Sequence, residues 1–237
     1  MLKEAIEKIV SLAENKTYSI GTHTYADKPL VLIEEPVDRP QNCTVNGLDS
    51  AAKLVRNEIA RVTCPIFIRV CDPRKVTIFT TYRDDCKRDL LYTVDCDVPQ
   101  FAAGWREQDA AIIELRSKFI ENDGVKYLID LLSRIVKEDS VASSDNGVTQ
   151  TVEARQGISL SSKVTVKPRV KLIPYRSFLE IEQPESEFLL RLDENGRIGL
   201  FEADGGMWQM DAKKRIADYF AVSLADLVKS GDVVVMV

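Results

Sequence analysis

The stretch PIFIRVCDPRKVTIFTTYRDDCKRDLLYTVDC (Pro65–Cys96) decides the fold of this chain. It contains three segments rich in β-branched and aromatic residues, at Pro65–Cys71, Lys75–Tyr82 and Leu90–Cys96. Such residues favour strands, and the connections between these segments are short and polar. Because parallel strands need long crossover connections, the stretch predicts an antiparallel sheet.

A helix is predicted on the N-terminal side of this sheet. Apolar residues recur there at spacings of four and three, the pattern of an amphipathic helix. They are Leu48, Ala52, Val55, Ile59 and Val62. Asn46 is the expected N-cap, and the helix is expected to lie across the sheet.

The first residues of the chain form a second amphipathic pattern. Its apolar positions are Leu2, Ile6, Ile9, Val10 and Ala13. The segment lacks the continuous apolar core of a signal peptide, so we expect the protein to stay in the cytoplasm. The sequence also has no run of about 18 apolar residues, the length of a membrane-spanning helix, so no membrane partner is expected.

A helical pair is predicted on the C-terminal side of the sheet. Apolar residues share one helical face in each helix. They are Ile112, Leu115 and Phe119 in the first, and Val125, Leu128, Leu132 and Ile135 in the second. Asn122 or Asp123 is expected to begin the second helix.

The polar segment Ser140–Asn146 is the predicted domain boundary. Residues 1–139 would form an α+β domain, and residues 147–237 a β-rich domain with a terminal helix. A single continuous domain is the alternative.

The C-terminal part is predicted to be a β meander closed by a helix. Its expected strands lie in VTQTVEA, KVTVKPRVKLI, RSFLEIEQ, EFLLRL, RIGLFEA and MWQM. Asn195-Gly196 is the expected hairpin turn. A helix over Asp211–Phe220, a short helical turn at Leu224–Lys229 and an apolar tail, DVVVMV, are expected to follow.

This order of elements predicts an α+β fold with mixed, mainly antiparallel sheets, because strands and helices do not alternate throughout. The sequence contains no G-x-G-x-x-G and no G-x-x-x-x-G-K-[ST] motif. Dinucleotide-binding and P-loop folds therefore lack support, and we expect no cofactor.

Composition narrows the class of protein. A hydrophobic content of 45% and a charged content of 29% are typical of soluble globular domains. A net charge of -5 argues against a protein whose main task is to coat nucleic acid. The five cysteines form no C-x-x-C pair, so we expect reduced, mostly buried thiols rather than disulfides or a zinc site.

Acidic residues cluster in the C-terminal third. Glu180 and Glu182 would project to the same side of a strand, with Glu202 and Asp204 one hairpin away. Converging carboxylates can hold Mg²⁺, which makes a metal-dependent hydrolase one alternative. The favoured interpretation is a solvated strand face, and no metal is expected.

Aromatic and arginine side chains in the same region suggest a ligand site, since rings stack on bases and guanidinium groups bind phosphate. Core packing explains most of these rings equally well. His23 is the single histidine and is expected to be an ordinary surface or hydrogen-bonded residue rather than a catalytic one. The candidate ligand-binding residues are His23, Tyr25, Lys28, Tyr175, Arg176, Glu180, Arg191, Glu202, Asp204 and Trp208.

Basic residues alternate with apolar ones in KVTVKPRVKLI, which is the period of a strand. The basic positions are Lys163, Lys167, Arg169 and Lys171. The favoured interpretation is an edge strand whose solvated basic face resists aggregation. A stripe that binds phosphates is the alternative.

Five segments of the chain carry a resemblance to a known family. They are HTYADKP (His23–Pro29), FAAGWREQDAAIIELRSKFIEND (Phe101–Asp123), DNGVTQTVEARQGI (Asp145–Ile158), PYRSFLEIEQPESEFLLRL (Pro174–Leu192) and LFEADGGMW (Leu200–Trp208). In this order they resemble the YfdQ-like family of uncharacterised phage and prophage proteins. The resemblance implies an accessory protein made inside a bacterial host cell, and it transfers no catalytic residue.

We therefore expect a homo-oligomeric binding or assembly protein that acts without catalysis. Its amphipathic first helix, apolar tail and edge-like strands are expected to serve self-association. A nucleotide-like small molecule or a host protein is the expected partner. The alternatives are a single-stranded nucleic-acid-binding accessory of phage replication or recombination and the Mg²⁺-dependent hydrolase.

Overall fold

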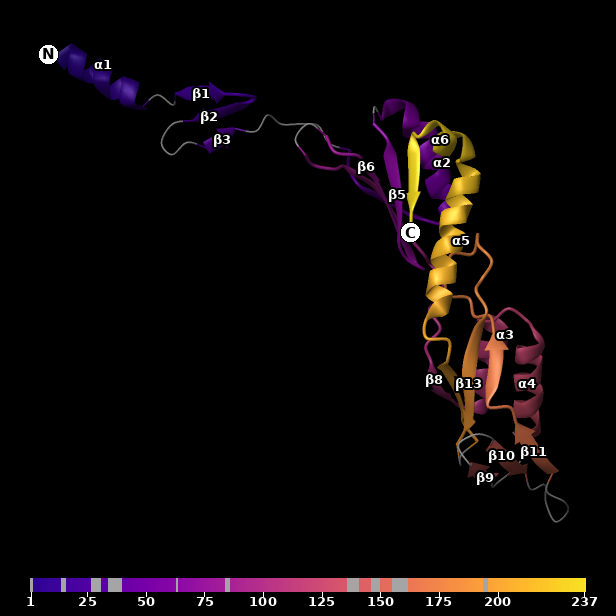
Figure 1. The fold of residues 1–237 in the computed structure, drawn as a ribbon. Helices are drawn as coiled ribbons and strands as arrows, with labels where there is room; N and C mark the ends of the chain where they lie inside the picture. Colours follow the sequence, from indigo (N-terminus) through magenta and orange to yellow (C-terminus); the bar gives the residue numbers. More distant parts are fainter. Residues whose placement is uncertain are drawn as a thin grey trace. The chain divides into compact units, whose positions relative to one another are not determined.

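The computed structural model describes residues 2–13, 16–26, 31–33, 40–62, 64–83, 86–135, 141–145, 150–154, 162–193 and 196–237 (Figure 1). The chain divides into two compact units, Met1–Arg39 and Pro40–Val237. Each unit is described by itself below.

The described residues of the first unit form one helix and one small sheet. Helix α1 spans Leu2–Ala13, and the strands are β1 (Thr17–Ile20), β2 (His23–Ala26) and β3 (Val31–Ile33). The strands pair antiparallel in the order β1-β2-β3. Gly21 has a φ of 62° between β1 and β2, a conformation that glycine adopts without strain.

The second unit begins with the sheet that the sequence predicts. Its strands are β4 (Cys43–Asn46), β5 (Ile66–Asp72), β6 (Lys75–Thr80), β7 (Leu90–Asp95) and β15 (Val233–Met236), in the order β15-β5-β6-β7-β4. The central strands β5, β6 and β7 pair antiparallel, as predicted, and both edge strands pair parallel. The apolar tail is therefore an edge strand of this sheet rather than a free segment.

Helices cover one face of this sheet (Figure 1). They are α2 (Leu48–Glu58), which continues into a 3₁₀ turn at Ile59–Arg61, α5 (Met207–Ser223) and α6 (Ala225–Ser230). Ile66, Ile68 and Val70 of β5 point to the helices and are buried, as alternation along a strand requires. Phe220 and Leu224 close this core from the helix side.

A second core lies between another sheet and the helical pair. The sheet has the order β12-β13-β14-β8, built from β12 (Arg169–Leu172), β13 (Ser186–Leu192), β14 (Ile198–Glu202) and β8 (Gly104–Arg106). The helices are α3 (Gln108–Ser117) and α4 (Asp123–Ile135). Phe101 packs edge-on against Phe119 and Phe188 in this core. Asn122 accepts a hydrogen bond from the Val125 amide at 2.9 Å, so the predicted start of α4 is confirmed.

The remaining strands, β9 (Val141–Asp145), β10 (Gln150–Ala154) and β11 (Ser162–Val166), form a sheet of order β11-β10-β9. Part of the predicted boundary segment, at residues 136–140 and 146–149, lies outside the described residues. Chain segments on both sides of it share sheets, because β15 pairs with β5 and β8 pairs with β14.

The α+β class is confirmed, and several predicted elements are wrong in detail. MWQM forms the first turn of α5 rather than a strand, because Asp204 and Gly206 start the helix immediately before it. RSFLEIEQ is a loop, and its side-chain hydrogen bonds replace a strand ladder. The predicted strand KVTVKPRVKLI (Lys163–Ile173) is interrupted at Pro168, which has no N–H to donate.

Two further predictions need correction. The N-cap of α2 is Gly47 rather than Asn46, whose amide side chain instead donates to Asp97 at 2.5 Å. The cysteines are free, but they are not mostly buried. Cys43 and Cys86 are exposed and Cys64, Cys71 and Cys96 are partly buried.

Candidate functional site

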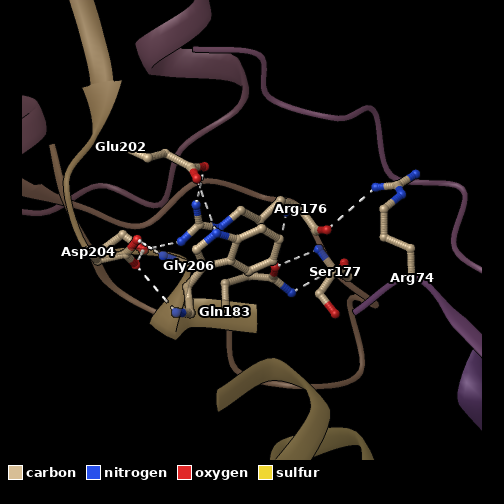
Figure 2. Close-up of polar contacts among 9 residues, drawn as sticks. Arg74, Arg176, Ser177, Gln183, Glu202, Asp204 and Gly206 are labelled. Carbon is tan, nitrogen blue, oxygen red and sulfur yellow. Dashed lines mark hydrogen bonds and ion pairs between the residues drawn. The ribbon is translucent and has the colours of Figure 1, made fainter. Parts of the chain in front are cut away.

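Arg176 lies in the loop between β12 and β13, and this loop is held rigidly (Figure 2). The side-chain oxygen of Gln183 accepts hydrogen bonds from the amides of Arg176 and Ser177, both at 3.1 Å. Its side-chain nitrogen donates to the carbonyl of Phe178 at 2.8 Å. The Ser177 hydroxyl donates to the Pro73 carbonyl at 2.5 Å and ties the loop to the turn between β5 and β6.

The guanidinium group of Arg176 is enclosed by protein. Its side chain is 1% exposed and lies 3.8 Å from the ring centroid of Trp208. One terminal nitrogen donates to Glu202 at 2.8 Å and the other donates to the Ser186 hydroxyl. Among the described residues, Nε has no hydrogen-bond partner. Figure 2 shows Arg176 pointing between Glu202 and Asp204.

Asp204 joins this cluster to the start of α5. Its carboxylate accepts from the Ser186 hydroxyl at 2.8 Å and from the backbone amides of Gly206 at 3.0 Å and Trp208 at 3.3 Å. The amides at a helix start have no partners within the helix, and a carboxylate there also meets the positive end of the helix dipole.

Burial and charge have opposite effects on this cluster. Burial lowers the pKa of Arg176 to about 10, although Glu202 and Asp204 both raise it. Burial opposes ionisation of Asp204, but the hydrogen bonds from Ser186, Gly206 and Trp208 and the charge of Arg176 outweigh it, and the pKa of Asp204 is lowered. Arg176 is therefore charged at neutral pH. The carboxylates that balance this charge belong to Glu202 and Asp204 of the protein itself.

Glu180 serves a different element. Its Oε1 atom accepts from the Leu48 amide at 2.6 Å and from the Asp49 amide at 3.4 Å. The N-cap residue of α2, Gly47, has no side chain that could accept these hydrogen bonds. Glu180, which is distant in the sequence, provides the acceptor instead. A Cβ atom on Gly47 would lie 2.6 Å from the same Oε1, so glycine leaves the space that Glu180 occupies.

The alternative of a metal site requires its four candidate ligands to converge, and in the structure they do not. Glu202 and Asp204 meet at Arg176, whereas Glu180 caps α2 and Glu182 pairs with Arg215 at 2.9 Å. The strand that would have aligned Glu180 with Glu182 is a loop. Within the described part of the chain, no group of three His, Cys, Asp or Glu side chains is placed to hold a metal ion.

Tyr175 lines a cavity of about 530 Å³, whose lining includes no residue of the arginine cluster. Val98, Pro99 and Leu179 give this cavity an apolar lining, and Lys118 and Asp97 are its charged members. Leu179 is 66% exposed at this site. The volume falls within the range of small-molecule sites, about 300–1,000 Å³.

The other candidates lie apart from Arg176. Arg191 is a partly buried residue of β13, where it pairs in register with Gly199. His23 and Tyr25 belong to the first unit, in β2, with their ring centroids 6.5 Å apart. Lys28 lies outside the described residues.

Most of the predicted basic stripe is engaged within the protein. Arg169 pairs with Glu187 at 2.7 Å and Lys171 with Glu185 at 3.1 Å. The Lys167 ammonium lies 5.0 Å from the ring centroid of Tyr127. Lys163 is in β11, and its side chain is outside the described part of the chain. Carboxylates therefore balance the charges of Arg169 and Lys171, which weakens the case for a phosphate-binding stripe.

The sequence interpretation missed the polar residues that hold the cluster together, namely Gln183, Ser177 and Ser186. Pro184, directly after Gln183, was a usable signal against a strand, because proline cannot donate to a ladder. Nothing in the local pattern of Ser186 indicates that its hydroxyl bridges Arg176 and Asp204.

No model of a known protein family, no curated protein and no solved structure matches this chain. Across the helices that the structure describes, none combines the length and the apolar character needed to span a membrane.

Proposed function

We propose that the protein acts without catalysis, as a self-associating binding protein made during phage infection or from a prophage. The clustered charged groups support a non-catalytic role, because Arg176 donates to Glu202 and Ser186, and Ser186 in turn donates to Asp204, so that these contacts join the loop to β14 and to the start of α5. The observation that carries self-association is the exposed apolar face of α1.

Helix α1 presents large apolar side chains to solvent. Leu2 is 80% exposed, Ile6 54% and Ile9 65%. Their spacings of four and three residues are those of a coiled-coil seam. Isolated helices shorter than about 12–15 residues are marginal in water, so a 12-residue helix of this kind gains from a partner that covers its seam.

A second copy of α1 is the partner that its charges favour. The polar side of the helix carries Lys3 and Lys8 together with Glu4 and Glu7, so it has no net charge. An anionic membrane surface attracts helices with an excess of basic residues, which α1 lacks. Two copies of a neutral helix meet without net repulsion, and closed homo-oligomers are the common result of such pairing.

Solution mass by light scattering tests this proposal. The wild-type protein is expected to form an oligomer of fixed size, and a variant with Ile6→Gln and Ile9→Gln is expected to have a smaller mass. The matched control carries Glu4→Gln and Lys8→Gln on the polar side of the same helix and should keep the wild-type mass. A monomeric wild type, or an Ile6/Ile9 variant of unchanged mass, would overturn the proposal.

A further inference from the structure

The face of the five-stranded sheet that points away from α2 and α5 carries aromatic and basic side chains. Alternation places Phe67 and Arg69 of β5 on this face, opposite the buried Ile66, Ile68 and Val70. Phe79 of β6 pairs in register with Phe67 and lies on the same face. In Figure 1, the helices lie on the other side of β5 and β6.

Three rings and one guanidinium group form a connected platform on this face. Phe67 and Phe79 stack with ring centroids 5.8 Å apart and an interplanar angle of 14°. Arg88 lies over both rings, at 5.2 and 5.3 Å from their centroids, and 4.0 Å from the centroid of Tyr82. A hydrogen bond from Arg88 to the Thr80 carbonyl, at 3.1 Å, fixes the guanidinium in this position.

The platform is open to solvent. Tyr82 is 64% exposed, and Arg88 and Arg69 are exposed. In the part of the chain that the structure describes, no carboxylate forms an ion pair with Arg69 or Arg88. Lys75 on the same face lies opposite Asp95 in register, so the positive charge of the platform comes chiefly from the two arginines.

We propose that this open face binds single-stranded nucleic acid. Bases stack on aromatic rings and on guanidinium planes, which Tyr82 and Arg88 offer side by side. Arg69 lies two residues from Phe67 along β5, where it can neutralise a phosphate of the same strand. The shared chemistry of single-stranded DNA and RNA, unstacked bases on a phosphate backbone, fits both parts of the platform.

A duplex does not fit this surface. Bases in a duplex are stacked on one another, and sequence readout in its grooves requires a helix or ribbon that protrudes. On the sheet face, by contrast, the Tyr82 ring is open to solvent, and Phe67 and Phe79 are partly buried beneath Arg88. The site shares no residue with α1 or with the arginine cluster, so the inference does not rest on self-association.

Fluorescence anisotropy at low salt tests the inference, with labelled oligothymidylate, oligouridylate and a duplex of equal length. Wild type is expected to bind at least one single strand more tightly than the duplex. A Tyr82→Ala and Arg88→Ala double variant should lose at least about 10-fold in affinity, since one stacked base contributes about 1–3 kcal/mol. Arg69→Ala should weaken binding and reduce the salt slope by about one.

Two substitutions on other surfaces serve as controls. Arg169→Ala removes an exposed arginine that Glu187 already pairs, and Tyr18→Ala removes an exposed tyrosine of the first unit. Both should bind as wild type, and circular dichroism should show all variants folded. Tighter binding of either single strand than of the duplex supports the inference. It is overturned if wild type binds neither strand, binds the duplex equally well, or keeps its affinity without Tyr82 and Arg88.

Discussion

Arg176 and Arg88 both place a guanidinium group over an aromatic ring, and their surroundings differ in every other respect. Arg176 lies 3.8 Å from the Trp208 centroid and Arg88 lies 4.0 Å from the Tyr82 centroid. Arg176 is 1% exposed and is hydrogen-bonded to Glu202 and Ser186, whereas Arg88 is exposed and bonds a backbone carbonyl.

The comparison shows that an arginine stacked on an aromatic ring is not by itself evidence of a structural role or of a ligand site. A buried cation needs fixed anionic partners, because desolvation without them is unfavourable. Glu202 and Asp204 provide them for Arg176, and the cluster then joins the loop, β14 and the start of α5. Water solvates Arg88, so its charge and its ring partners are available to a ligand.

The largest expected effect is that of Arg176→Met on stability. The substitution removes the cation that pairs with Glu202 and the N–H group that donates to the Ser186 hydroxyl. Breaking a buried ion pair destabilises a fold by about 3–5 kcal/mol. Because Glu202 keeps contact with solvent, we expect the free energy of unfolding to fall by about 3 kcal/mol. Urea unfolding measures it, with Arg169→Met as a control that should lose less than about 1 kcal/mol. Similar losses for both variants would contradict the role given to the Arg176 cluster.

Gly47→Ala is expected to have the next largest effect. The substitution introduces a side chain at a φ of 85° and places Cβ 2.6 Å from Oε1 of Glu180. We expect a loss of about 2 kcal/mol, since strained backbone conformations contribute about 1–3 kcal/mol each. In a Glu180→Ala background only the backbone strain remains, so the same substitution should be less harmful there. Equal losses in the two backgrounds would show that Glu180 does not occupy this space.

Asp204→Asn is expected to change how stability depends on pH. The pKa of Asp204 is lower in the folded protein than its unfolded value of about 3.9. Its contribution is therefore present above about pH 4 and is lost as the pH falls through the lower folded pKa. The variant should be less stable at neutral pH and should lose less stability on acidification. If the free energies of unfolding of the variant and the wild type differed by the same amount at every pH from 7 to 2, the titration of Asp204 would not contribute to stability.

Arg88→Met is expected to have the smallest effect on stability. The exposed guanidinium contributes its contacts with the rings, which are worth about 0.5–1 kcal/mol at such sites, and one hydrogen bond to the Thr80 carbonyl. Thermal unfolding compares it with Arg176→Met in the same buffer. A loss for Arg88→Met as large as that for Arg176→Met would mean that the open platform also supports the fold.

The central sheet could be predicted from the sequence because its strands follow local rules. Ile66, Ile68 and Val70 alternate with more exposed residues, a two-residue turn connects β5 to β6, and the polar segment 81–89 connects β6 to β7. The same alternation places Phe67 and Phe79 together on the outer face. The strand pattern could therefore have predicted this pair of rings, which the sequence analysis did not name.

The arginine cluster could be predicted only as a set of residue types. Arg176, Glu202, Asp204 and Trp208 were candidates, but their mutual contacts depend on a loop that local propensity assigns to a strand. Distant tertiary contacts, such as Ser177 with Pro73 and Glu180 with Leu48, override that propensity. The parallel pairing of β15 with β5 is likewise a contact between distant parts of the sequence.

Hydrogen exchange of the arginine Nε–H groups, followed in a single nitrogen-15 spectrum, tests the central comparison most directly. Arg176→Lys and Arg88→Lys variants assign the two signals. The account predicts that the Nε–H of Arg176 exchanges far more slowly than that of Arg88, because the former is enclosed by Trp208 and the carboxylates while the latter meets water. Comparable exchange rates for the two groups would contradict the account.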